Sequence, residues 1–130
     1  MSIDKLKTIN DFNGSLTVVN ETSPNLFPIK RIFFIYNVPI NITRGKHCHK
    51  NTKQYLICLS GSCKVSLDDG KNYKETYELN SPSKGIFQNN LIWGELFDFR
   101  ENTVLLVLAS EHYDEKDYIK NYEEFKTYVS

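Results

Sequence analysis

The feature that most constrains the fold is a succession of short apolar runs, each of strand length and separated by residues typical of turns. The runs are rich in aromatic and β-branched residues, which favour strands over helices. Gly14, Gly61 and Asp68–Gly70 supply turn residues between them. The predicted strands span 15–19, 30–37, 54–59, 63–67, 74–79, 83–87, 91–97 and 103–109. Short strands in such close succession favour a β-sandwich or barrel.

Only the C-terminal tail has helical spacing. Its apolar residues at near-helical intervals are Tyr118, Ile119, Tyr122 and Phe125. Asp114 can cap the segment, so the pattern predicts a helix at about 115–128, which could cover a sheet face or a partner subunit. No repeat, linker or low-complexity tract divides the chain, and residues 1–130 are expected to form a single domain.

Charge and composition exclude several function classes. The 16 basic and 16 acidic residues cancel, which removes the electrostatic reason to expect nucleic-acid or membrane binding. The beginning of the chain does not resemble a signal peptide, and no apolar run approaches membrane-spanning length. The three cysteines lack zinc-finger spacing and are expected to be reduced thiols. These features predict a small cytoplasmic domain.

The segment His47-Cys48-His49 carries the strongest chemical signal. It follows Arg44-Gly45-Lys46 and precedes the strand-like run that begins at Gln54. Successive side chains of a strand point to opposite faces, so the two imidazoles share a face and Cys48, a predicted packing residue, turns away. Two imidazoles so placed can bind a metal or transfer protons near neutral pH.

The spacing around this segment resembles the first cupin motif, which has two histidines, a carboxylate and a glycine. Here the carboxylate position holds Gln54, a poor metal ligand, while Gly61 keeps the glycine spacing. The second cupin motif usually adds a histidine, where this chain has Gly94. Two imidazoles fall short of the three or four ligands of catalytic metal sites, and His112, the remaining histidine, lies beside the predicted helix. We therefore expect acid–base chemistry without a metal or other cofactor.

A closer resemblance covers nearly the whole chain. Its motifs occupy 44–50, 60–63, 67–70, 79–82, 93–99, 104–110 and 113–119. In that order they resemble the sugar-nucleotide 3,4-ketoisomerases. The resemblance implies a mainly β cupin fold, a jelly-roll-like barrel or sandwich with a C-terminal helix. Several family members carry a histidine where this chain has Gly94, so the resemblance does not extend to a third imidazole.

The resemblance also implies an activity. The family isomerises dTDP-4-keto-6-deoxy-D-glucose to a 3-keto-6-deoxyhexose without metal, through an enediol-like intermediate. A homodimer is implied, with exchange of N-terminal strands between subunits as a further possibility. The product would feed an aminotransferase that makes a 3-amino-3,6-dideoxyhexose for a surface polysaccharide such as lipopolysaccharide.

His47 and His49 are the implied catalytic residues. One would remove the C3 proton as a base, and the other would move protons between the sugar oxygens or to C4. We favour His47 as the base. The alternative is that both are polar residues at a barrel mouth without a catalytic role.

Four further residues are candidates for substrate binding, each with a structural alternative. Tyr36 could donate a hydrogen bond to a sugar or phosphate oxygen, or be a half-buried core tyrosine. Arg44 could clamp the pyrophosphate, or be a solvated turn residue. Arg31 is a weaker phosphate candidate that could instead pair with a carboxylate. Gln54 could hydrogen-bond a histidine or the sugar, or cap its strand.

Trp93 and Glu95 complete the candidate set. They alternate with Gly94 and would share one face of a strand. Trp93 could line the sugar pocket, although core packing is the stronger expectation. Glu95 could orient a histidine or pair with a surface lysine.

Three other functions remain open from the sequence. The chain could be a noncatalytic cupin that binds a sugar nucleotide, a dTDP-sugar 3,5-epimerase, or a metal-dependent cupin dioxygenase. Each predicts a different outcome for metal dependence or for hydrogen exchange at C3, C4 and C5 of the sugar.

Overall fold

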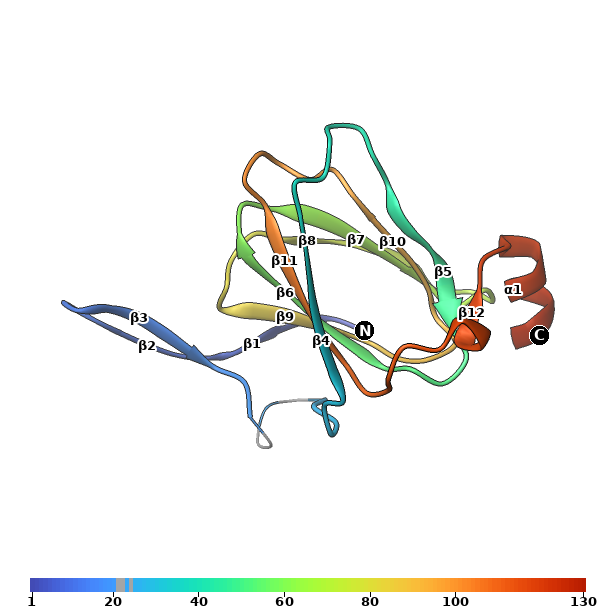
Figure 1. Ribbon diagram of the computed structural model, residues 1–130, viewed down its shortest axis with the longest axis horizontal. Helices are drawn as coiled ribbons and strands as arrows, with labels where there is room; N and C mark the ends of the chain where they lie inside the picture. Colours follow the sequence, from blue (N-terminus) through green and yellow to red (C-terminus); the bar gives the residue numbers. More distant parts are fainter. Residues whose placement is uncertain (21–22, 24) are drawn as a thin grey trace.

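Two five-stranded antiparallel sheets face each other in the computed structural model, which describes residues 1–20, 23 and 25–130 (Figure 1). The first sheet has the order β1-β9-β6-β11-β4. Its strands are β1 (Ile3–Lys5), β9 (Lys84–Gln88), β6 (Gln54–Ser60), β11 (Val104–Ala109) and β4 (Arg31–Tyr36). The second has the order β12-β5-β10-β7-β8. Its strands are β12 (Tyr118–Ile119), β5 (Arg44–His49), β10 (Trp93–Phe97), β7 (Cys63–Asp68) and β8 (Lys74–Leu79). The predicted mainly β sandwich is confirmed.

The space between the sheets is filled by apolar side chains over most of its length. The buried members of this core are Leu56, Cys58, Cys63, Val65, Leu67, Leu79, Ile86, Ile92, Phe99, Leu105 and Val107. Ile92 and Phe99 flank β10, and the others come from strands of both sheets, which explains why alternate residues of these strands are apolar. All three cysteines are free and buried, as the sequence predicted.

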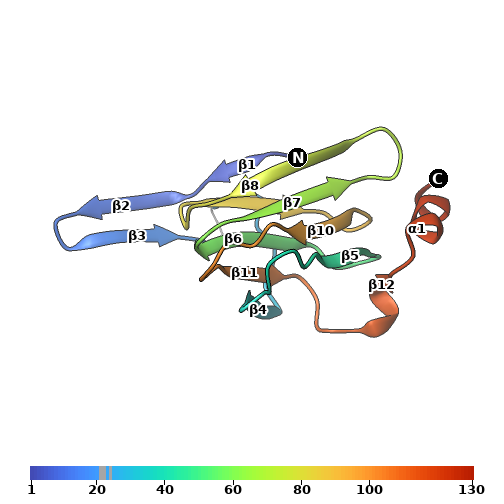
Figure 2. The same cartoon turned by 90° about the horizontal axis from the view of Figure 1, so that it is seen from above.

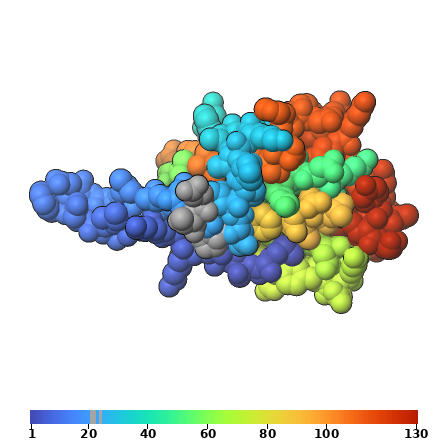
Figure 3. Space-filling view, turned by 90° about the horizontal axis from the view of Figure 1, so that it is seen from below, coloured from blue at the N-terminus to red at the C-terminus, as the bar shows by residue number. Residues whose placement is uncertain are grey.

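A two-stranded hairpin stands apart from the sandwich. It consists of β2 (Lys7–Asp11) and β3 (Gly14–Val18), and it projects from one end of the molecule (Figures 2 and 3). Residues 15–19 were predicted as a strand, but β1 and β2 were not. Both lie before the first turn signal and carry alternating polar residues, so they lack the apolar run typical of a buried strand.

The C-terminal helix begins later than predicted. Glu115–Asp117 forms a 3-10 turn, Tyr118–Ile119 forms β12, and the α-helix α1 spans Tyr122–Val129. The expected helix over about 115–128 is therefore wrong in its first half. The Asp117 side chain bonds to three groups of the segment 49–52, and β12 pairs with β5, so these contacts outweigh the helical spacing.

Helix α1 packs on the outer face of the second sheet, chiefly through one residue. Phe125 is fully buried and forms a cluster with Cys48, Trp93 and Ile119. The side chain of its N-cap, Asn121, accepts a hydrogen bond from the Glu124 amide at 2.9 Å. Among the described residues, no helix is long and apolar enough to cross a membrane.

Candidate active site

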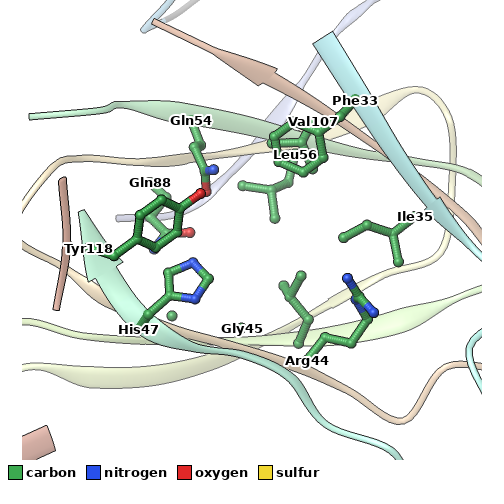
Figure 4. A pocket seen from close by; sticks show the side chains of 12 residues that line it. Phe33, Ile35, Arg44, Gly45, His47, Gln54, Leu56, Gln88, Val107 and Tyr118 are labelled. Carbon is green, nitrogen blue, oxygen red and sulfur yellow. The ribbon is translucent and has the colours of Figure 1, made fainter. Parts of the chain in front are cut away.

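A cavity of about 170 Å³ opens between the two sheets, at the end of the sandwich where the apolar core stops. Apolar side chains of the first sheet form one wall, and β5 and β10 form the other (Figure 4). The lining residues are Phe33, Ile35, Arg44, Gly45, His47, Gln54, Leu56, Gln88, Gly94, Leu96, Val107 and Tyr118. A small apolar cavity with a few polar groups is typical of a small-molecule site.

Strand β5 carries a β-bulge directly before the first histidine. Gly94 pairs with His47 and Glu95 pairs with Gly45, so Lys46 has no partner across the pair. Gly45 and Lys46 have φ angles of 83° and 60°. A Cβ on Gly45 would lie 2.9 Å from the carbonyl oxygen of Gly94, so both the backbone angle and the close approach require glycine. The bulge sets the direction in which His47 points.

His47 and His49 lie on the same face of β5, as predicted. Their ring centroids are 5.0 Å apart and the rings meet edge to face. Cys48 points the other way into the outer cluster, which confirms the packing role expected for it. The two imidazoles thus form one site, but their surroundings differ.

His47 is half-buried and lines the cavity. Its pKa is lowered from 6.5 to about 4, mainly by removal of the ring from water and then by the neighbouring His49. The imidazole is therefore neutral at physiological pH. A neutral imidazole that faces a cavity can accept a proton from a bound molecule.

His49 lies behind His47 and is only 2% exposed. Its Nδ1 lies 2.8 Å from Oδ2 of Asp117, which also accepts a hydrogen bond from the Thr52 hydroxyl at 2.6 Å. Oδ1 of the same carboxylate accepts from the amide of Asn51 at 2.6 Å. Burial lowers the pKa of His49 despite this carboxylate. A neutral His49 therefore donates from Nδ1 to Asp117 and keeps a lone pair on Nε2.

The carboxylate of Asp117 is held ionised. Burial alone would raise the pKa of Asp117, but the hydrogen bonds from Thr52, His49 and Asn51 lower it overall. Nε2 of His49 is buried and has no hydrogen-bond partner among the residues that the structure describes. Such an atom is costly to leave unpaired, which points to a proton-transfer or ligand-binding role.

Asp117, Tyr118 and Gln88 were missed as site residues. Asp117 and Tyr118 fell inside the predicted helix, and their position beside the histidines depends on β12, a strand of two residues. Gln88 pairs with Gln54 across β6 and β9, and both line the cavity. A Cβ on Gly94 would lie 2.5 Å from Nε2 of Gln88, so the glycine leaves room for this amide. Alternation along β9 could have placed Gln88 beside Gln54 once the register was known.

Two of the substrate-binding candidates line the cavity. Gln54 is buried at 8% exposure on β6, and Arg44 is exposed at the start of β5 (Figure 4). Arg31 lies close to the site without lining the cavity. Its guanidinium carbon is 5.2 Å from the ring centroid of Phe33 and 5.7 Å from that of Tyr113. Its positive charge contributes to the lowered pKa of His49.

The other three candidates lie outside the cavity. Tyr36 is 57% exposed and stacks on Phe34, because alternation along β4 turns both rings away from the sandwich interior. Trp93 packs in the outer cluster under α1, in agreement with the stronger expectation of core packing. Glu95 accepts a hydrogen bond from the Trp93 indole nitrogen at 2.9 Å, and within the described chain it forms no hydrogen bond or ion pair with a histidine or lysine.

The ligand set for a metal is small. Outside residues 21–22 and 24, no three His, Cys, Asp or Glu side chains gather in a way that could hold a metal ion. The geometry instead fits proton transfer, with a neutral imidazole in the cavity and a second imidazole held by a carboxylate behind it.

Comparison with known proteins assigns the family. The family model described as "FdtA: WxcM-like, C-terminal" matches residues 1–130. The chain is 43% identical over 124 residues to TDP-4-oxo-6-deoxy-alpha-D-glucose-3,4-oxoisomerase of Aneurinibacillus thermoaerophilus, covering 95% of this chain and 88% of that protein.

Solved structures agree with this assignment. A mutant of the 3,4-ketoisomerase QdtA from Thermoanaerobacterium thermosaccharolyticum, in complex with TDP-4-keto-6-deoxyglucose, is 44% identical with a TM-score of 0.92, covering 98% of this chain and 92% of that chain. WlaRA, a TDP-fucose-3,4-ketoisomerase from Campylobacter jejuni, is 39% identical with a TM-score of 0.91, covering 99% and 95%. The chain belongs to the FdtA family of cupin-type sugar-nucleotide 3,4-ketoisomerases.

Proposed function

We propose that this protein moves the keto group of dTDP-4-keto-6-deoxy-D-glucose from C4 to C3. The observation that carries the proposal is the neutral His47 in the cavity, backed by the His49–Asp117 pair. The relatives named above, which act on TDP-linked keto-deoxysugars, support the same substrate class.

The reaction requires three proton movements. A base removes the hydrogen on C3, and the electron pair forms an enediolate with negative charge on O4. The hydroxyl proton on O3 passes to O4, and a proton added to C4 completes the 3-keto product. Atoms and electrons balance without an oxidant, so the site needs only groups that accept and donate protons.

We assign His47 as the base at C3. Its half-buried ring faces the cavity, and its pKa of about 4 keeps the ring unprotonated at neutral pH. A bound sugar and the apolar wall opposite would exclude water and strengthen the electrostatic interactions inside.

We assign His49 as the second proton carrier. Asp117 fixes its tautomer, so that Nε2 can accept a proton and the resulting imidazolium would be stabilised by the carboxylate. Because His49 is buried and does not line the cavity, we assign it to proton relay rather than to removal of the C3 hydrogen.

Substrate binding is proposed for four polar groups around the cavity. Gln54 and the adjacent Gln88 would hydrogen-bond sugar oxygens from the first sheet. Arg44, exposed at the cavity edge, would bind the pyrophosphate, and Arg31 is a second cation near the site. Tyr36, Trp93 and Glu95 lie outside the cavity of a single chain and are not included.

The test is conversion of dTDP-4-keto-6-deoxyglucose in deuterated buffer, followed by NMR, with and without a chelator. We expect a 3-keto product labelled at C4, an unlabelled C5, and equal rates in both buffers. Label at C5 would indicate a 3,5-epimerase, and binding without any label would indicate a noncatalytic module. Loss of turnover on chelation would contradict metal independence.

The oligomeric state of the enzyme, its location and the use of its product are also proposals. The projecting β2–β3 hairpin carries exposed Ile9, Phe12 and Leu16, and β4 exposes Ile32 and Phe34, which supports a homodimer that covers apolar surface. Sedimentation of the purified protein tests this directly. We further propose a cytoplasmic enzyme whose product is aminated at C3 for surface polysaccharide synthesis.

A further inference from the structure

Tyr118 lies on the short strand β12, beside both histidines. Its ring lies 4.9 Å from the centroid of His47 and 4.4 Å from that of His49. It also lines the cavity, together with His47 (Figure 4). Within the described chain, its hydroxyl makes no hydrogen bond.

The backbone fixes this side chain in place from both sides. The preceding residue, Asp117, is held by three hydrogen bonds, and the following residue, Ile119, is 2% exposed in the outer cluster. Neighbouring residues on a strand point to opposite faces, and Ile119 points outward, so Tyr118 must point inward. It therefore lies on the same face as its pairing partner, His49. The phenol is therefore preorganised and does not depend on a bound ligand for its position.

The ionisable groups around the Tyr118 ring leave its hydroxyl unengaged. The ammonium of Lys120 lies 5.6 Å from the centroid of the Tyr118 ring. The same cation contributes to the lowered pKa of His47. Both facing imidazoles are neutral, and the carboxylate of Asp117 is engaged by three donors. An oxyanion that forms in the cavity would thus meet one unpaired O–H donor.

We propose that Tyr118 is a third catalytic residue, whose hydroxyl donates a hydrogen bond to the O4 oxyanion of the enediolate. This inference rests on the proposed function, because it concerns the intermediate that forms when His47 removes the C3 proton. A fixed donor aimed at a developing oxyanion lowers the barrier most in a site shielded from water. Before proton transfer neither imidazole presents an N–H to O4, because His47 is the acceptor at C3 and Nδ1 of His49 is bonded to Asp117.

The variant Tyr118→Phe tests the proposal because it removes the hydroxyl and keeps the ring that contacts both histidines. We expect kcat to fall about 100-fold, with KM changed less than about threefold and an unchanged melting temperature. Deuterium wash-in at C3 of recovered dTDP-4-keto-6-deoxyglucose should fall in parallel, since it passes through the same enediolate.

The matched control is Tyr113→Phe. Tyr113 is 63% exposed, contacts the Tyr118 ring at 5.8 Å and does not line the cavity. We expect its kcat to stay within about twofold of wild type. The inference would be overturned if the wild-type enzyme converts substrate and the Tyr118→Phe variant has the same kcat, with or without a change in KM. A wild-type protein that makes no 3-keto product would overturn the proposed function, and this inference with it.

Discussion

The two faces of strand β5 have different roles, one in the candidate active site and one in packing. The inner face carries His47 and His49 beside a cavity, whereas the outer face carries Cys48 in an apolar cluster under helix α1. The side chains are only one residue apart in the chain. The contrast indicates that changes on the inner face affect turnover, while changes on the outer face affect stability.

The largest expected effect is on the inner face, from His47→Asn. Removal of the base should lower kcat by about 1,000-fold while TDP binding persists, because asparagine has similar size but accepts no proton at this pH. Steady-state kinetics with binding calorimetry would measure both. His112→Asn is the control, since His112 is exposed and lies outside the cavity. Equal losses in the two variants would show that the inner face has no special role.

On the outer face, Phe125→Ala should lower the free energy of unfolding by about 3–5 kcal/mol, because it leaves a hole in a fully buried cluster. Under conditions where the variant remains folded, kcat should stay within about threefold of wild type. Denaturant unfolding and kinetics together measure this. Thr127→Ala, exposed on the same helix, should change stability by less than about 0.5 kcal/mol. A fall in kcat well beyond threefold in the folded variant would show that the outer face also affects turnover.

Asp117→Asn acts on the inner face through His49. An amide cannot accept hydrogen bonds at both positions where the carboxylate does, so the tautomer of His49 would no longer be fixed. We expect kcat to fall about 100-fold with little change in KM, and the Nδ1 proton of His49 to disappear from the NMR spectrum. Asp114→Asn, which changes an exposed cap, is the control. A retained proton signal with full activity would remove Asp117 from the mechanism.

The smallest expected effect is that of pH. The pKa of His47 lies near 4, below the ordinary 6.5, so the base is neutral at any pH well above 4. The value of kcat/KM should therefore change less than about twofold between about pH 5.5 and 7.5. A base with an unperturbed pKa would lose about tenfold at the acid end of that range. A pH–rate profile with a limb near 6.5 would show that the ring is more hydrated than its burial implies.

The sequence was sufficient for the fold and for the histidine pair because both depend on local patterns. Alternation along short strands predicted the sandwich, and the two-residue spacing placed His47 and His49 on one face. The Asp117–His49 contact depends instead on a tail segment that joins the sheet 68 residues away along the chain. Helical spacing in that tail concealed a two-residue strand, and no local pattern reports such long-range pairing.

The positions of Tyr36 and Trp93 show a second limit of sequence. Each lies on a correctly predicted strand, yet each faces away from the cavity. Alternation tells which residues share a face, but it does not tell which face meets the other sheet. That choice depends on the register of the whole sheet and on what covers its outer side.

The most direct test of the account compares hydrogen exchange at C3 in two variants. Recovered dTDP-4-keto-6-deoxyglucose from deuterated buffer would be examined by NMR after incubation with His47→Asn or His49→Asn. If His47 is the base and His49 the second carrier, deuterium should enter C3 with the His49 variant and not with the His47 variant, and neither should form product at the wild-type rate. Wild-type product formation by both variants would contradict the assignment of this pair as the catalytic groups.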